Sequence, residues 1–181
     1  MTLDDLIAFV ANLFEKSGID YFVFGATAMN LWMPPRNTID VDIVVCVERR
    51  KARRVLSILR AHEFPIAKSL ERKFLEGRVI KVPRGDVGLD LALCRTAHDR
   101  EAFRRSVYFE DPEFRLRVAT PEDLVLFKLQ VWRRQDQADI ERILREVHDL
   151  DARYVESWLA RIEEDTGWPM AARWLEISGS V

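Results

Sequence analysis

Asp40 and Asp42 lie two residues apart within the otherwise apolar segment 39–45. In an extended strand, side chains two apart share a face and lie roughly 6.6 Å apart at ~3.3 Å rise per residue. Two carboxylates this close resist joint ionisation, and burying them without partners is costly. A divalent cation removes both difficulties, because Mg²⁺ takes one or two carboxylates together with water and phosphate oxygens. The pair is therefore a candidate metal site.

A third aspartate, Asp90, occurs inside a second apolar segment, 87–94. An aspartate between Leu89 and Leu91 has little reason to lie in a sheet unless it faces a cation or a polar partner. We favour a role as a further metal ligand. The structural alternative is an ion pair between Asp90 and a nearby arginine.

The residues before the first aspartate pair are suited to phosphate. Gly25, Ala26 and Thr27 join an expected strand to an expected short helix, and small residues with helix-start N–H groups favour a phosphate ligand. Taken alone, this segment is better explained as a tight strand–helix junction. Arg36 precedes Asp40 by four residues, and it either contacts a triphosphate or pairs with an acid as a structural arginine.

The pattern of apolar residues predicts the elements that position these side chains. The predicted fold is α/β, a small mixed sheet flanked by helices, with a core over 1–119 and a C-terminal helical segment over 120–181 packed on it as one compact domain. Asp136 is predicted to cap the helix over 137–147, and Pro83 with Arg84-Gly85 to turn the chain. We expect strands over 21–24, 39–45, 78–82 and 87–94, a hairpin of 107–109 with 114–119, and helices over 2–17, 25–33, 48–61, 120–132, 137–147, 151–165 and 169–177.

Two segments carry a resemblance to a known family. Gly25-Ala26-Thr27-Ala28 followed by Arg36-Asn37-Thr38-Ile39-Asp40-Val41-Asp42 resembles the signature of the nucleotidyltransferase superfamily with a DNA-polymerase-β-like core. The closest branch is that of the small bacterial AbiEii-like toxins. The segment TPEDLVLFKLQVWRRQDQADI, from Thr120, resembles the same family's helix with a lysine, an arginine and D-x-x-D. The resemblance covers about residues 20–145, and Ala26 departs from it where the family has Gly or Ser.

The resemblance implies metal-dependent transfer of a nucleoside monophosphate from an NTP, such as ATP, to an acceptor. It implies that Mg²⁺ or Mn²⁺ is held by Asp40, Asp42 and Asp90. It further implies that Gly25, Ala26, Thr27, Arg36 and Lys128 bind the nucleotide. The structural alternative for Lys128 is a surface lysine. For Asp136 and Asp139 we favour a structural role, tying helices together.

The composition limits the partners. A net charge of −2 gives no global attraction to nucleic acid, although the run from Arg49 to Arg60 is basic. This run is either a solvated face or a track for an RNA backbone. Cys46 and Cys94 are expected to be buried thiols in a reducing compartment. The acidic start of the chain is not a secretory signal, and no apolar run reaches the length of a membrane span, so we expect a cytoplasmic protein.

Several functions remain open from the sequence. The acceptor is RNA, protein or a small molecule, and an aminoglycoside-type small molecule is the main alternative within the enzyme class. The alternative from another class is a non-catalytic nucleotidyltransferase-like module that binds a partner in a toxin–antitoxin pair. A cognate antitoxin or a second copy of the chain would be its protein partner.

Overall fold

The computed structural model describes residues 1–179. The chain forms two compact units, one made of residues 1–28 and 36–119, the other of residues 29–35 and the chain from Thr120 onward. The first unit contains the sheet and the second is helical, and each is described by itself below. The predicted α/β class with a mixed sheet is confirmed.

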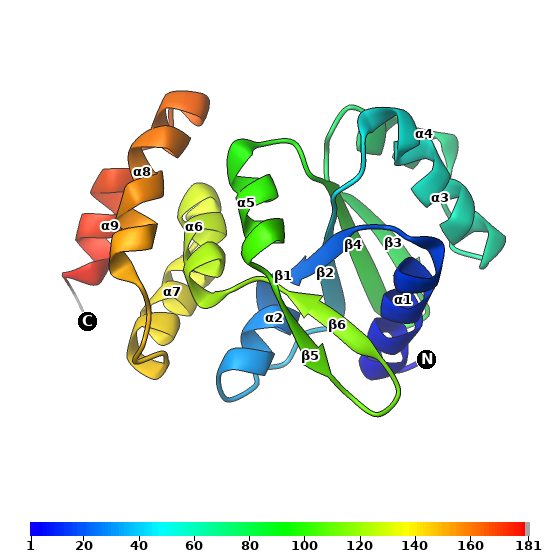
Figure 1. The fold of residues 1–181 in the computed structure, drawn as a ribbon, viewed down its shortest axis with the longest axis horizontal. Coiled ribbons are helices and arrows are strands. Elements are labelled where there is room, and N and C mark those ends of the chain that lie inside the picture. The colour runs from blue at the N-terminus through cyan, green and yellow to red at the C-terminus, as the bar shows by residue number, and fades with distance from the viewer. Residues whose placement is uncertain (180–181) are drawn as a thin grey trace. The chain divides into compact units, whose positions relative to one another are not determined.

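A six-stranded mixed sheet forms the first unit (Figure 1). Its order is β3-β4-β2-β1-β6-β5, so that β2 lies inside the sheet between β1, which is antiparallel to it, and β4, which is parallel. The strands are β1 (Tyr21–Phe24), β2 (Asp40–Val45), β3 (Ile80–Arg84), β4 (Val87–Leu93), β5 (Val107–Glu110) and β6 (Arg115–Val118).

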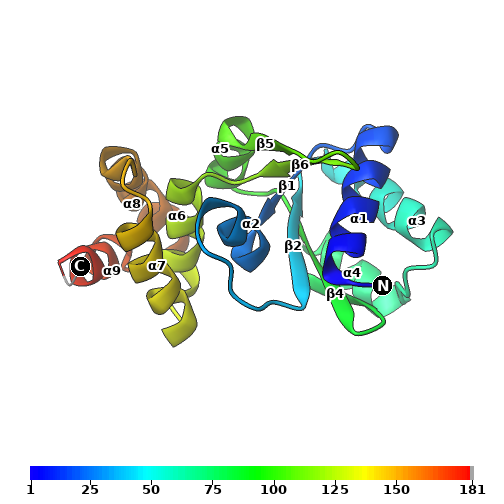
Figure 2. The ribbon, with the colours of Figure 1, turned by 90° about the horizontal axis from the view of Figure 1, so that it is seen from below.

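The helices of this unit begin with α1 (Leu3–Ser17), which packs against β2, β4 and β6 on one side of the sheet (Figure 2). Thr2 begins α1 with a capping box, and Gly18 ends it in the left-handed conformation that glycine adopts without strain. The other helical elements are η1 (Arg49–Lys51), α3 (Ala52–Ala61), α4 (Lys68–Leu75) and α5 (Ala97–Arg105), while α2 (Gly25–Trp32) begins in the first unit and ends in the second.

The alternation of β2 sets the direction of its acids. Val41, Ile43 and Val45 are buried on one face, and Asp40 and Asp42 lie half-buried on the other. The aliphatic side chains hold the strand in the core through the burial of apolar area. Their burial fixes the register, because a slip of one residue would drive both carboxylates into the apolar side.

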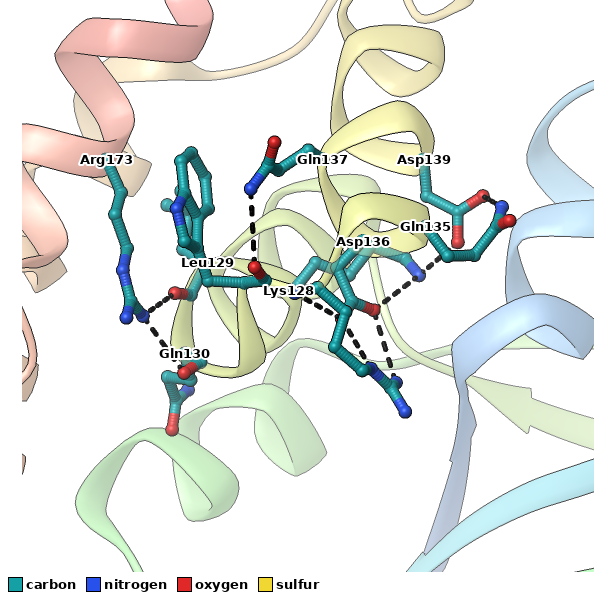
Figure 3. A network of polar contacts seen from close by, with 10 residues as sticks. Lys128, Leu129, Gln130, Gln135, Asp136, Gln137, Asp139 and Arg173 are labelled. Carbon is teal, nitrogen blue, oxygen red and sulfur yellow. Dashed lines mark hydrogen bonds and ion pairs between the residues drawn. The ribbon is translucent and has the colours of Figure 1, made fainter.

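The second unit is built around α6 (Pro121–Val131), which contacts α7 (Arg134–Glu146), α8 (Ala152–Thr166) and α9 (Met170–Ser178). Its first turn is buried, and the acids there have partners: the Tyr154 hydroxyl donates to Asp123 at 2.7 Å, and the Asp151 N–H donates to Glu122 at 3.2 Å. At its other end, the Arg173 guanidinium donates to the carbonyls of Leu129 and Gln130 (Figure 3). Among residues 1–179, no helix is long and apolar enough to span a membrane.

Two predictions about local structure are wrong. Pro83 does not turn the chain, because β3 continues to Arg84; β3 is an edge strand, where a proline costs no sheet hydrogen bond if it faces outward. Asp136 is not the N-cap of α7. Arg133 holds that position, and Asp136 lies in the first turn, where its carboxylate accepts the Arg133 N–H at 3.0 Å.

Candidate active site

The sheet brings Asp40, Asp42 and Asp90, the aspartate site, onto adjacent positions of two strands. β2 and β4 run parallel with Asp42 directly beside Asp90 and Asp40 beside Gly88. Residues in register on neighbouring strands point to the same face, so the three carboxylates share one face. The next strand extends this row, because β3 places Lys81 directly opposite Asp90.

Lys81 connects two of the three carboxylates. Its ammonium lies 2.9 Å from Asp90 Oδ2 and 3.3 Å from Asp40 Oδ2. The hydrogen bond to Asp90, with the contribution of Asp40, raises the pKa of Lys81 above its ordinary value. The lysine therefore remains charged and partly neutralises the aspartate site, although its side chain is 72% exposed.

Two glycines leave room for the carboxylates. Gly25, the first residue of α2, has a φ of +65°, and a Cβ built there would overlap the Asp42 carboxylate. Gly88 lies beside Asp40 in the register, and a Cβ there would overlap the Asp40 carboxylate. Any larger residue at either position would push an acid out of the site, so both glycines help to define its shape.

The donor set fits a hard divalent cation. Asp90 Oδ1 is buried and has no hydrogen-bond partner, a costly state for a carboxylate oxygen unless a ligand meets it. As they stand, the side chains of residues 1–179 form no ready-made cluster of three or more metal-ligating groups. Lys81, lying between Asp40 and Asp90, occupies part of the space in which the oxygens would converge. Three carboxylates on one face remain the oxygen-rich set that Mg²⁺ or Mn²⁺ takes.

The residues around the aspartate site hold its backbone. The hydroxyls of Thr27 and Thr38 both donate to the Asp40 carbonyl, at 3.3 and 3.1 Å. Thr27 thus joins the start of α2 to the start of β2. Ala26 is buried, and Arg36 donates to the carbonyl of Asn37 at 3.3 Å. Phosphate contacts by Gly25, Ala26, Thr27 and Arg36 stay predictions.

Lys128 belongs to the second unit, where it lies in a buried group of charges (Figure 3). Its ammonium donates to Asp139 at 2.6 Å and lies 3.8 Å from Asp136. Gln135 donates to Asp139 at 3.1 Å, and Arg133 donates to Asp136 at 2.8 Å. We call these five residues the α6–α7 ion cluster. The structure gives Lys128 a structural partner, and its contact with a nucleotide stays a prediction.

Sequence reasoning missed Lys81 and Gly88, although a signal for Lys81 existed. Gly85-Asp86 is a two-residue loop, and such a loop fixes the pairing of the strands on either side. Counting back from Arg84 opposite Val87 places Lys81 opposite Asp90. Gly88 had no comparable signal, since its need for space arises from Asp40 on another strand.

Comparison with known proteins decides the family. Residues 9–170 match the family described as nucleotidyl transferase AbiEii toxin, type IV TA system. The chain belongs to the AbiEii nucleotidyltransferase family. As a member of this family, it is an enzyme of the nucleotidyltransferase class, and the predicted resemblance is confirmed. No protein with a curated description matches its sequence.

Solved structures share the fold of this AbiEii family member. ANT(2″)-Ia, solved with adenylyl-2″-tobramycin, has a TM-score of 0.58 and 17% identity over 91% of this chain and 99% of its own. An antigenic nucleotidyltransferase-like protein from Paracoccidioides brasiliensis has a TM-score of 0.55 and 18% identity over 95% and 92%. The lincosamide antibiotic adenylyltransferase LnuA has a TM-score of 0.54 and 13% identity over 79% and 96%.

Proposed function

We propose that this enzyme transfers a nucleoside monophosphate from an NTP to an acceptor, with a divalent cation held by Asp40, Asp42 and Asp90. The observation that carries the proposal is the in-register placement of Asp42 beside Asp90, where one buried oxygen of Asp90 lacks a partner. Neighbouring carboxylates repel one another, and a divalent cation would offset this repulsion more strongly than the single charge of Lys81 does. Membership of the AbiEii family supplies the class of reaction.

The reaction forms a bond from an acceptor oxygen to the α-phosphorus and breaks the bond from that phosphorus to the pyrophosphate oxygen. When bound, the divalent cation supplies charge that stabilises the attacking and leaving oxygens of such an in-line displacement. Asp40 and Asp42 orient the ligand in this proposal, because two threonine hydroxyls hold the Asp40 carbonyl and the neighbouring glycines leave room for both carboxylates. In this proposal Asp90 also helps to activate the acceptor hydroxyl as a general base.

The nucleotide-binding residues of the proposal are Gly25, Ala26, Thr27, Arg36 and Lys128. The support for the first three is their place at the β1–α2 junction, since β1 ends with Phe24 paired to Asp42. N–H groups at this helix start are donors to phosphate oxygens. Arg36 and Lys128 supply positive charge, although the Asp139 contact of Lys128 would have to be exchanged.

The acceptor is the finer part of the proposal. An RNA acceptor would need unpaired basic residues along η1 and α3, but most of them have partners in the structure. Arg50 and Lys51 pair with Glu48, and Arg53 and Arg60 pair with Glu71. This pairing favours the solvated-face interpretation of the basic run. A protein or small-molecule acceptor, including an aminoglycoside, is therefore proposed ahead of RNA.

A label-transfer experiment tests the function and the acceptor together. Each of four NTPs labelled at the α-phosphate is incubated with the protein, Mg²⁺ or Mn²⁺, and separately with cell RNA, cell protein or a panel of aminoglycosides. We expect one fraction to become labelled only when the cation is present. Absence of label in every fraction, with a folded protein that an NTP and Mg²⁺ stabilise against heating, would favour the non-catalytic module.

The family description suggests a biological role for the same activity. We propose that the chain acts in the cytoplasm as the toxin of a toxin–antitoxin pair, in which transfer to its acceptor slows growth. Induced expression in bacteria should arrest growth, and the Asp42→Asn variant at equal expression should not. Equal toxicity of the two proteins would separate toxicity from transfer.

A further inference from the structure

A lysine at a proposed cation site needs an explanation. Lys81 lies opposite Asp90 on an edge strand, and its ammonium contacts Asp90 and Asp40 at 2.9 and 3.3 Å. A divalent cation held by the same two carboxylates would lie next to this ammonium. Like charges at such a distance repel strongly, so both cannot keep these positions.

The side chain of Lys81 is able to leave. It is 72% exposed and lies on β3, which ends the sheet, whereas the Asp90 side chain is 12% exposed. A lysine side chain is long and flexible and loses little by returning to water. The contact is therefore a replaceable one, unlike a buried ion pair.

We propose that the Lys81 ammonium holds the carboxylates of Asp40 and Asp90 together in the cation-free enzyme, and that the divalent cation displaces it on binding. The proposal rests on the proposed function, because it concerns the same three carboxylates. Lys81 is a positioning residue: it acts through Asp40 and Asp90. Because the cation must displace Lys81, the nucleotide-free enzyme binds the cation more weakly. Binding of the cation together with the negatively charged nucleotide is therefore favoured.

Calorimetric titration of Mn²⁺ into the nucleotide-free protein tests this proposal without an activity readout. We expect Lys81→Met to bind Mn²⁺ about ten-fold more tightly than the native chain, because one competing charge is removed. Lys81→Gln should behave in the same way, and Lys81→Arg should keep the native affinity. Lys73→Met, which removes an exposed lysine from α4, is the matched control and should change nothing.

Unchanged or weaker Mn²⁺ binding by both folded neutral variants would overturn the role of Lys81. The proposed function fails separately: if Asp42→Asn binds Mn²⁺ as the native chain does, the aspartates do not hold the cation. Circular dichroism of each variant establishes that the fold is retained. The two neutral variants differ in shape, so loss of folding in one leaves the other as the test.

A second inference comes from the opposite end of the same two strands. Cys46 follows β2 and Cys94 follows β4, directly after Val45 and Leu93, which are in register. The Cys94 N–H donates to the Val45 carbonyl at 2.9 Å, which continues the ladder to the cysteines. Adjacent strands lie about 4.8 Å apart, within the Cα separation of about 4.4–6.8 Å that a disulfide needs.

The two thiols affect each other's ionisation. The neighbouring Cys46 lowers the pKa of the Cys94 thiol, whereas Cys94 and burial raise the pKa of the Cys46 thiol. Neither residue is fully buried, and Cys46 lines a surface pocket together with Asp20, Glu48 and Arg54. A small oxidant therefore has access to the pair.

We infer that Cys46 and Cys94 are a modification site, at which peroxide forms a reversible disulfide between β2 and β4. The Cys94 thiolate attacks the peroxide oxygen and becomes a sulfenic acid, and Cys46 then attacks that sulfur. One S–S bond forms, the two thiols lose two protons and two electrons, and the peroxide is reduced to two molecules of water. In a reducing compartment such a bond is transient and reports on oxidation.

Intact mass measurement after brief treatment with hydrogen peroxide tests the site. We expect a loss of two hydrogens, full protection of both cysteines from maleimide in denaturant, and reversal by dithiothreitol. Cys46→Ser and Cys94→Ser should each lack the mass loss. Two thiols that still react in denaturant, or a gain of oxygen with no cross-link, would overturn the inference.

Discussion

Two groups of lysine and aspartate in this protein use the same residue types in opposite ways. At the aspartate site, Asp40 and Asp90 contact the ammonium of Lys81, whose side chain is 72% exposed, and the buried Oδ1 of Asp90 has no hydrogen-bond partner. In the α6–α7 ion cluster, two carboxylates face the ammonium of Lys128, whose side chain is 8% exposed, and the guanidinium of Arg133. There, Gln135 donates to the remaining oxygen of Asp139 at 3.1 Å.

The difference between the two groups distinguishes a candidate ligand-binding site from a structural ion cluster. A buried group whose charges and hydrogen bonds are all matched holds helices together, and removing one partner is destabilising. A buried carboxylate oxygen without a hydrogen-bond partner, such as Oδ1 of Asp90, is costly and indicates a place where a ligand could bind. Substitutions in the two groups should therefore affect different properties.

The largest expected effect is on transfer, from Asp42→Asn. We expect the rate of label transfer to fall at least a thousand-fold, about 4 kcal/mol or more in activation free energy, because a proposed cation ligand is lost. The fold should be retained, because asparagine has nearly the same size and shape as aspartate. Transfer assays and thermal melts of the same preparation check both. A variant that melts normally and transfers at the native rate would show that Asp42 is not needed for transfer.

Lys128→Met should act mainly on stability. Two buried carboxylates would lose their ammonium, and we expect the free energy of unfolding to fall by about 3 kcal/mol. Urea unfolding followed by fluorescence measures the change. The matched variant is Lys81→Met, whose exposed lysine should alter stability by less than about 1 kcal/mol. Similar losses of unfolding free energy for the two variants would mean that the aspartate site and the α6–α7 ion cluster contribute to stability in the same way.

Gly25→Ala adds one methyl group at the aspartate site. We expect a loss of about 1–2 kcal/mol from the positive φ of this residue, together with loss of Mn²⁺ binding, because the new Cβ displaces the Asp42 carboxylate. Gly85→Ala is the control: its φ is also positive, but its Cβ would meet nothing within 4 Å. The control should lose stability alone. Equal Mn²⁺ binding by both variants would show that Gly25 is not needed for space.

The smallest effect is expected from Gln135→Ala in the α6–α7 ion cluster. The substitution removes the donor to Asp139 Oδ1 from an exposed position, and we expect about 1 kcal/mol of destabilisation. Chemical unfolding detects this difference. Gln137→Ala, two residues further along α7, loses only a bond to the Trp132 carbonyl and should cost less. The reverse order would argue that full pairing of Asp139 does not stabilise the cluster.

The sequence alone was sufficient to predict the strands and helices that carry the aspartate site. The alternation around Asp40 and Asp42 predicted β2, the Gly25 junction predicted the change from strand to helix, and Thr120 with Pro121 predicted the start of α6. These signals are local, since strand alternation and helix caps depend on residues a few positions apart. The family resemblance rested on the same segments.

Only the tertiary structure decided which side chains meet. Strand order placed Asp90 beside Asp42 and Lys81 opposite Asp90, and it placed Gly88 under the Asp40 carboxylate. It also buried Lys128 against Asp139, where a surface or nucleotide-binding lysine was predicted. Pairings between strands and helices far apart in the chain depend on the packing of the whole core, and a linear pattern of residue types does not encode them locally.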